Sequence, residues 1–368
     1  MHTFTQMHIA LIPVFRNEFS LDTVTIGLFA SIPLLIQAIF TIPGGLLADR
    51  IDRVRIITLS LGLSAVGGVL ISFTNSVPMI ILFTSFFLIS STLLHPPALS
   101  AIGEFISPRV RGRALGIFNS AGAFGIALGP LALSVFLGLW GWRPVYLLWS
   151  IPAFLIPWFL LRLRLPASTS PSRSPDDSSS EFQILRNVSL IILLAILGVR
   201  AVAGNVINTY ITPYFVDVWS IDPATASLIF GIRPLMSLFA SPMGGVMVDR
   251  ISEKLWILIG LIARIISILI LAVSPSFTLI IIGYLLNSFF GNMEMPAVQS
   301  LIARLTPQQS RGFAFSLSFL PGTITGAIAP IAAAFLVDAW GLWYIFPLAL
   351  VMLICGLGLL SGLWHRIS

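Results

Sequence analysis

The sequence GLLADR at 45–50 recurs as GVMVDR at 245–250, an offset of 200 residues. The same offset aligns three further pairs of dipeptides: Arg111-Gly112 with Arg311-Gly312, Gly129-Pro130 with Ala329-Pro330, and Trp140-Gly141 with Trp340-Gly341. Four coincidences at one offset, in one order, indicate that the two halves share one architecture. Each copy lies between two long apolar segments. A chain built twice from such segments is typical of transporters, in which the substrate path runs between the repeats.

Long stretches without charge make up most of the chain. Hydrophobic residues account for 57% and charged residues for 9%, whereas an ordinary soluble domain carries about 25% charged residues. Runs such as 24–48, 77–103 and 114–142 exceed the roughly 20 residues that cross about 30 Å of hydrocarbon as helix. Strands of a membrane barrel would be shorter and would alternate polar with apolar residues. The sequence therefore predicts an all-α polytopic membrane protein.

Twelve spans are predicted from these runs. They lie near 1–15, 24–48, 55–74, 77–103, 113–138, 144–164, 188–213, 224–248, 255–273, 276–303, 312–338 and 342–364. Under the 200-residue offset Met1 falls on Ala201, inside the seventh span, so we expect either that the true start lies upstream or that the first helix is shortened. It lacks a basic leader and a small-residue cleavage site, and we expect no signal peptide.

The Lys and Arg residues predict the orientation. With the turn after the second span in the cytoplasm, fifteen of the 20 fall on that side, Arg16 and Arg143 fall outside, and Arg200, Arg233 and Arg264 lie within spans. Cations in short loops favour the cytoplasmic side, which predicts this orientation. We expect a multi-pass protein of a cell membrane, namely a prokaryotic inner or plasma membrane. The net charge of +6 then reflects this topology and the attraction of the cations to anionic lipid headgroups. The scattered cations form no single patch for nucleic acid.

The only sizeable polar segment, 165–187, is rich in Ser, Pro and Asp. Such a composition favours a flexible connector, which could also carry regulation. It predicts a six-helix half at 1–164, a cytoplasmic linker at 165–187 and a second six-helix half at 188–368. The carboxyl terminus is also predicted to be cytoplasmic.

The turn at 45–55 resembles the signature of the major facilitator superfamily between helices 2 and 3, usually written G-x-L-A-D-R-x-G-R-R/K, with Asp52 in place of its second Gly. The resemblance covers essentially the whole chain. It implies the major facilitator fold, with twelve transmembrane helices, and a motif that latches the halves together on the cytoplasmic side. The gating residues implied are Gly45, Asp49, Arg50 and Arg53, with Gly245, Asp249 and Arg250 in the second copy. An ordinary solvated turn is the alternative.

A second motif lies in the fifth span, with Gly116, Gly125, Gly129 and Pro130. It resembles the helix-5 signature of drug/proton antiporters, although Leu133 and Ser134 replace the closing Gly pair. Glycines at this spacing form a close-packing groove, and proline bends the helix. Generic helix packing is the alternative to an export signature.

Charges inside spans are the remaining evidence for a site, since each costs about 2.5–3.5 kcal/mol at the centre of the bilayer. Glu294 lies roughly 27 Å from the outer edge and Arg200 roughly 18 Å from the inner edge, at 1.5 Å per residue. Their depths allow the side chains to meet. In this superfamily helices 1, 4, 7 and 10 line the central cavity, so both are candidates for substrate or proton binding. Arg233 is a further candidate, whereas we expect Arg264 to reach the cytoplasmic interface.

Two further residues are candidates for the cavity. The fourth span lacks the arginine usual in drug/proton antiporters and carries His95 instead. Its imidazole could exchange a proton near neutral pH or could be a packing residue. Asn208 could contact a solute or another helix.

No paired carboxylates, activated nucleophile, metal cluster or phosphate loop is present in the sequence, so we expect no enzyme and no cofactor. The single cysteine, Cys355, excludes an internal disulfide. We expect a monomeric secondary transporter that moves a small organic solute by alternating access. Proton-coupled export is the main hypothesis. Proton-coupled uptake of a small organic anion is the alternative, because Arg200 and Arg233 would suit an anion.

Overall fold

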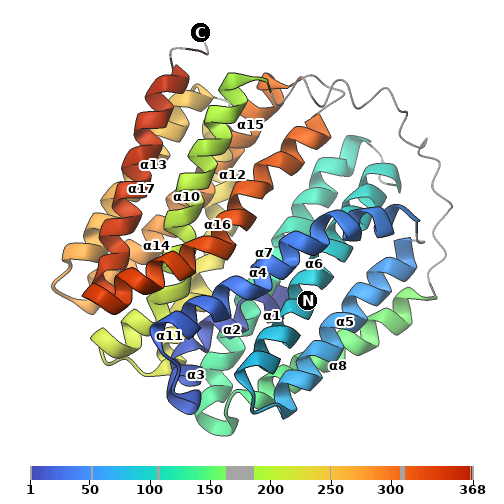
Figure 1. Cartoon of the computed structure of the whole chain (residues 1–368). Coiled ribbons are helices and arrows are strands. Elements are labelled where there is room, and N and C mark those ends of the chain that lie inside the picture. Colours follow the sequence, from blue (N-terminus) through green and yellow to red (C-terminus); the bar gives the residue numbers. More distant parts are fainter. Residues whose placement is uncertain are drawn as a thin grey trace. The chain divides into compact units, whose positions relative to one another are not determined.

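The computed structural model describes residues 2–50, 53–105, 108–162, 186–248, 250–306, 311–364 and 366. In this part of the chain every regular element is a helix (Figure 1), which confirms the all-α prediction. A helix satisfies its own backbone groups, as a lipid environment requires. The long helices are α4 (Thr23–Arg50), α5 (Arg53–Phe73), α6 (Val77–Phe105), α7 (Pro108–Trp140), α8 (Arg143–Leu160), α10 (Val188–Pro213), α13 (Glu253–Val273), α16 (Arg311–Trp340) and α17 (Ile345–Trp364).

Ten stretches of the described residues are long and apolar enough to cross a membrane. The first and tenth predicted spans are instead built from shorter helices. These are α1 (His2–Thr5), α2 (Met7–Ala10) and α3 (Ile12–Phe19), and then α14 (Phe277–Met293) and α15 (Met295–Leu305). Pro13 and Pro296 lie in the first turns of α3 and α15. Each removes a backbone donor, which explains why the helix is interrupted there.

The chain forms two compact units. Unit 1 comprises Met1–Pro171 and Phe215–Pro234, and unit 2 comprises Ser172–Tyr214 and Leu235–Ser368. The chain passes from one unit to the other next to two departures from α-helix, a π turn at Tyr214–Val218 and a 3₁₀ turn at Arg233–Met236. Between them lies α11 (Pro223–Ile232), and after them α12 (Ser237–Val248). The predicted division at 165–187 follows the sequence repeat and remains a prediction.

Unit 1 holds the segment Phe215–Pro234 by two kinds of contact. Helix α11 packs on α7, and a Cβ added at Gly231 would lie 3.0 Å from the backbone nitrogen of Leu131. Near the end of α3, Arg16 forms an ion pair with Asp217 of the π turn. The start of the eighth predicted span therefore packs with helices of the first half.

The backbone repeats at the same 200-residue offset as the sequence. Ser20 and Ser220 are the described non-glycine residues with positive φ, at 52° and 54°. Two residues later Asp22 and Asp222 cap the next helix, accepting hydrogen bonds from the backbone N–H of Thr25 (2.7 Å) and Thr225 (2.9 Å). The connection into the second helix thus has the same geometry in both halves.

The strength of both helix caps depends on the negative charge of the aspartate side chain. Hydrogen bonds from Thr25 lower the pKa of Asp22, and hydrogen bonds from Thr225 lower the pKa of Asp222. Because each pKa is lower in the folded state, the stabilisation is present above the ordinary carboxyl pKa. It is lost as the pH falls through the folded-state value.

We expect Ser20→Gly and Ser220→Gly each to stabilise the protein. Both serines are exposed, so little packing is lost, and glycine removes the 1–2 kcal/mol strain of left-handed backbone. Part of this gain is offset by the greater freedom of glycine in the unfolded chain. The net effect should be about 0.5 kcal/mol, or a rise of about 1–2 °C in the unfolding midpoint of purified protein. Ser20→Ala keeps the Cβ and serves as the control; an equal rise there would contradict the explanation.

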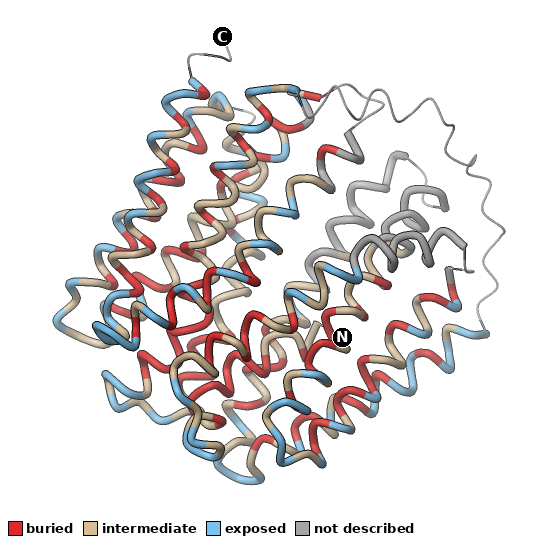
Figure 2. Tube along the Cα trace, in the orientation of Figure 1, coloured by how far each residue is buried: buried red, intermediate tan, exposed pale blue. Residues whose placement is uncertain are grey.

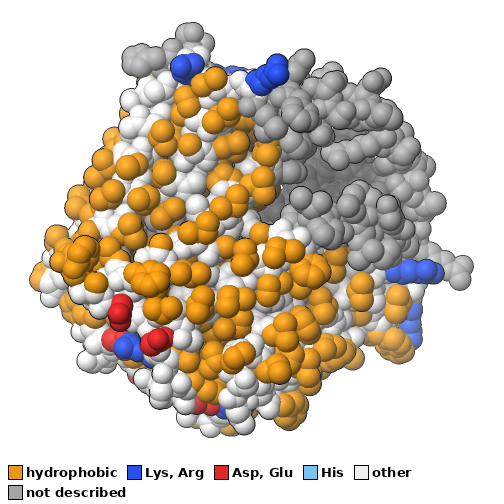
Figure 3. Space-filling view, in the orientation of Figure 1, with side chains coloured by type: hydrophobic (Ala, Val, Ile, Leu, Met, Phe, Trp, Pro, Cys, Tyr) orange, Lys and Arg blue, Asp and Glu red, His pale blue; other side chains and the backbone are white. Residues whose placement is uncertain are grey.

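The surfaces of both units are apolar. Large hydrophobic side chains are exposed along the helices, including Phe239, Val273, Phe319 and Ile354 at 66%, 73%, 70% and 56%. Figure 3 shows hydrophobic side chains over much of the described surface. The buried residues of α10 gather in its second half, from Ala203 to Pro213 (Figure 2). Exposed apolar side chains of this kind suit a lipid environment.

Candidate functional site

Three charged side chains meet in the interior of unit 2. Glu294 lies between α14 and α15, and its Oε1 atom contacts both Arg200 of α10 and Arg264 of α13, the latter at 3.2 Å. The side chains of Glu294, Arg200 and Arg264 are 0%, 7% and 8% exposed. We refer to these three residues as the buried charge cluster. The predicted meeting of Arg200 with Glu294 is confirmed, and the predicted cavity role of these residues remains a prediction.

The break in the tenth span is stabilised by α13 and α12. Pro296 has no N–H, so the helical ladder is interrupted next to Glu294. The N–H of Ala297 donates to the Glu294 carbonyl rather than to that of Met293, and the Met293 carbonyl accepts a hydrogen bond from the Trp256 indole at 3.1 Å. A Cβ added at Gly244 would lie 2.0 Å from this carbonyl. The carboxylate therefore projects from a break whose backbone is fixed by neighbouring helices.

Two glycines leave room for the cluster. A Cβ at Gly260 of α13 would lie 2.6 Å from Oε2 of Glu294, and a Cβ at Gly291 of α14 would lie 3.5 Å from Nε of Arg264. Real Cβ atoms essentially never approach as closely as the first distance. The absence of a side chain at Gly260 is therefore what admits the carboxylate between the helices.

The expectation for Arg264 was wrong. This residue lies at the middle of α13, eleven residues after its first residue Glu253, or about 16 Å along the helix. That depth is too great for its side chain to reach the interface, and it pairs with Glu294 instead. Its central position in an apolar helix was the signal that sequence reasoning should have used.

The other cavity candidates lie elsewhere. Asn208 is half-buried on α10, and Arg233 is half-buried in unit 1, where α11 gives way to the 3₁₀ turn. His95 of α6 also lies in unit 1, with its ring 5.0 Å from that of His2 and 5.8 Å from that of Phe118. His95 therefore lies among aromatic rings from the first and fifth predicted spans.

The helix-5 glycines form a groove for the first span. A Cβ at Gly125 would lie 3.0 Å from Cβ of His2, and a Cβ at Gly129 would lie 2.0 Å from the carbonyl oxygen of Thr3. Pro130 lies inside α7, which continues to Trp140. The backbone of Gly116 is helical, and its surroundings lie outside the described residues. The described glycines of the motif thus act by close packing.

Part of the gating motif lies outside the described residues. This part comprises Asp249, the surroundings of Gly45, and the side chains of Asp49, Arg50 and Arg53. Arg250 is exposed in the turn after α12. In the second copy a Cβ at Gly245 would meet nothing within 4 Å, so Gly244 is the close-packing glycine there. After this turn Glu253 pairs with Arg304 of α15 at 3.3 Å and accepts a hydrogen bond from Ser300 at 3.0 Å. The segment after the second copy therefore connects α13 with α15 within unit 2.

A polar cluster that the sequence did not indicate surrounds Glu18 at the end of α3. Glu18 pairs with Arg143 at 2.8 Å and accepts a hydrogen bond from the Trp142 indole at 2.7 Å. Arg143 also donates to Asn75 at 2.6 Å and stacks on Trp142. These contacts tie the first span to the loops before α6 and α8.

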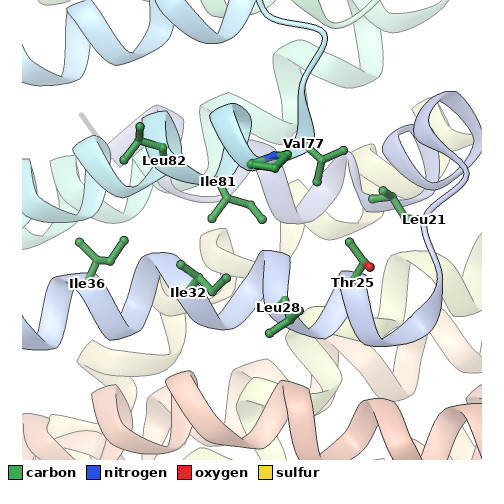
Figure 4. Close-up of a pocket in the computed structure, with 9 residues that line it drawn as sticks. Leu21, Thr25, Leu28, Ile32, Ile36, Val77, Ile81 and Leu82 are labelled. Atoms are coloured by element: carbon green, nitrogen blue, oxygen red, sulfur yellow. The ribbon is translucent and has the colours of Figure 1, made fainter.

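An apolar groove of about 500 Å³ lies between α4 and α6. In Figure 4 Leu28, Ile32 and Ile81 face it, and Thr25 is its polar residue. The groove offers no charge to orient a solute, so the buried charge cluster is the stronger candidate site. Among the described residues, no three His, Cys, Asp or Glu side chains are grouped to hold a metal ion.

Comparison with known proteins identifies the family of the chain. Residues 1–218 and 193–366 match the family model described as Major Facilitator Superfamily. The chain belongs to the major facilitator superfamily. It is thus a multi-pass membrane protein, and its family and fold are those of a secondary transporter.

Sequence relatives of this major facilitator include quinolone resistance protein NorB of Staphylococcus aureus. The proteins of strains JH9 and Newman are each 29% identical to it over 206 residues, which cover 55% of this chain and 42% of NorB. The chain spans about two fifths of the length of these curated relatives.

Solved structures confirm the major facilitator fold. A bacterial homolog to the human lysosomal transporter Spinster matches in its inward-facing unoccupied and occupied conformations, with TM-scores of 0.80 and 0.79. The sequence identities are 18% and 17%, and the matches cover 98% and 99% of this chain and 94% of each other chain. At this identity the likeness concerns the fold alone.

Proposed function

We propose that this major facilitator exports a small organic solute by alternating access, coupled to protons. The observation that carries the proposal is Glu294, a carboxylate buried far from the ends of its span and held by Arg200 and Arg264. A charge in this position is energetically expensive, so its presence there usually marks a functional site. The match to NorB, whose name associates it with quinolone resistance, supports export.

The coupling step follows from the chemistry of Glu294. In its charged form the carboxylate attracts guanidinium groups on α10 and α13 and so ties three helices together. A proton on the carboxylate removes this attraction and lets Arg200 separate from Glu294. A site that alternates between these two forms, and between the two sides of the membrane, moves a proton with each cycle. The protein's own side chains supply all of this chemistry.

Transport into membrane vesicles with an imposed pH gradient tests the function. We expect at least one compound in a panel of dyes and organic acids to move against its gradient, and to stop when a protonophore collapses the pH difference. Failure of every compound to respond to the gradient would refute proton coupling. The direction of net movement separates export from the second candidate, uptake of an organic anion. The presence of two guanidinium groups and one carboxylate in the cluster favours that candidate.

The orientation is part of this proposal, with linker 165–187 and the carboxyl terminus in the cytoplasm. The positive charges in the sequence support it. We expect reporter fusions at Ser172 and after Ser368 both to report a cytoplasmic location. A fusion at either place that reports the outer side would refute the orientation.

The proposed latch predicts that Asp49→Asn slows transport while the protein still folds and inserts. A carboxylate at a membrane edge pairs with cations or a helix amino terminus, and in the superfamily this motif holds one transport state closed. We expect turnover to fall about tenfold, the equivalent of one interaction of 1.4 kcal/mol. Normal turnover in Asp49→Asn, with expression matched to wild type, would exclude this residue from the latch.

A further inference from the structure

The buried charge cluster is unbalanced. Arg200 and Arg264 bring two positive charges, whereas Glu294 brings one negative charge. All three side chains are more than nine-tenths buried, so solvent screens the excess charge poorly. A buried charge of this kind is normally paired. The charge balance of these three side chains therefore leaves room for one further anion.

The hydrogen bonding of Arg200 is also incomplete. Both guanidinium groups contact the same oxygen of Glu294, Oε1. The Nε and Nη1 atoms of Arg200 are buried, and no described residue accepts a hydrogen bond from them. Unsatisfied polar groups in a protein interior are rare, and each calls for an explanation such as an absent ligand. A guanidinium with unused donors is well suited to a carboxylate.

A neutral hydrogen-bond donor, Asn287, lies on the face of α14 that packs on α13. Gly283 and Gly291 both face α13, where their Cβ atoms would meet Ser267 and Arg264. Asn287 lies one turn from each of them and therefore faces α13 as well. Its side chain is buried, and its Nδ2 atom has no hydrogen-bond acceptor in the part of the chain that the structure describes. Arg200 in the cluster, and Asn287 about 10 Å along the helix before Glu294, thus supply unfilled donors from two helices.

We propose that the buried charge cluster binds the acidic group of the transported solute, and that this solute is an organic monoanion such as a carboxylate. The inference rests on the proposed function and adds its substrate class. In the state without the proton, the acidic group of the solute replaces charged Glu294 as the partner of Arg200, and Glu294 stays with Arg264. This arrangement contains two cations and two anions, so every charge is paired. Because the cluster is closed in this structure, the acid enters when α10 separates from Glu294.

Thermal unfolding of the purified full-length protein tests the proposal with benzoate and its neutral amide, benzamide. We expect saturating benzoate to raise the unfolding midpoint by about 2–4 °C and benzamide to have no effect. In Arg200→Gln benzoate should have no effect, and in Arg200→Lys it should bind at least tenfold more weakly. Arg304→Gln removes an arginine that pairs with Glu253 outside the cluster, and it should respond as wild type does.

An equal response to benzoate and benzamide, or no response to either in the wild type, would overturn the proposal. So would a benzoate response that survives in both Arg200 variants. The measurement needs no gradient, so it is independent of the transport assay. In the vesicles, gradient-driven movement of amine-bearing dyes without any acid-bearing compound would refute the substrate class and leave proton-coupled transport standing. Lack of movement of every compound, together with a benzoate response, would refute the transport function alone.

Discussion

Replacing Glu294 with glutamine is expected to abolish the dependence of transport on the proton gradient while leaving some exchange of substrate across the membrane. Glutamine keeps the size of the side chain and can still accept a hydrogen bond, but it neither carries a negative charge nor binds a proton. Gradient-driven accumulation in vesicles should fall to the level reached without a gradient. Exchange of labelled for unlabelled solute should remain measurable.

The matched control for this substitution is Glu253→Gln. Glu253 also pairs with an arginine, Arg304, but it lies in the first turn of α13 at the end of a span. We expect Glu253→Gln to retain gradient-driven accumulation. Full accumulation in Glu294→Gln would show that the coupling proton binds elsewhere, and His95 would be the next residue to test. In that case the cluster would be a permanent connection between α10, α13 and the break in the tenth span.

Replacing Gly129 with alanine should destabilise the protein and abolish transport. The added Cβ would lie 2.0 Å from the Thr3 carbonyl and 2.7 Å from the Met7 side chain. A backbone carbonyl cannot move aside as a flexible side chain can, so the first span must leave its groove on α7. Overpacking of a core typically costs 1–3 kcal/mol, and we expect about 3 kcal/mol here. Thermal unfolding and vesicle transport measure the two effects.

Gly138→Ala is the control on the same helix. It lies beyond the groove, is exposed and has open space around its Cβ position. Alanine should leave transport unchanged there and could stabilise the helix by up to about 1 kcal/mol. Gly122→Ala, with a Cβ 3.4 Å from His2, should be intermediate. Equal effects at Gly129 and Gly138 would show that the close approach of Thr3 is unimportant.

The sequence predicted the charge cluster only in part. The position of a residue along a membrane-spanning helix can be counted from the sequence, whereas the face of the helix on which it lies is harder to predict. Counting residues from the span edges brought Arg200 and Glu294 to similar depths, and the structure confirms their contact. The same count places Arg264 at the middle of α13, yet nothing in its apolar surroundings shows which face of the helix it occupies. The role of Gly260 was equally hidden, because its partner Glu294 lies on another helix.

Helix interruptions were also difficult to predict. Pro13 and Pro296 coincide with breaks, whereas Pro130, Pro152 and Pro242 lie within helices that continue. A proline removes one hydrogen bond in every case, and neighbouring groups decide whether the helix bends or stops. At Met293 the deciding group is the indole of Trp256, a contact between residues far apart in the sequence. By contrast, the repeat at offset 200 predicted an equivalence that the backbone shows at Ser20 and Ser220.

The interrupted first span has a consequence for how the protein is made. Its short helices α1 to α3 carry polar side chains such as His8, Arg16 and Glu18, and ionisable side chains are costly to leave in lipid. Residues Phe4, Met7 and Phe15 are almost completely buried, partly against α7. This segment is synthesised before the groove that receives it, which follows more than a hundred residues later in the sequence. Its final position in the bilayer is therefore reached only after the fifth span has been translated, so early insertion and stable assembly are separate events for this part of the chain.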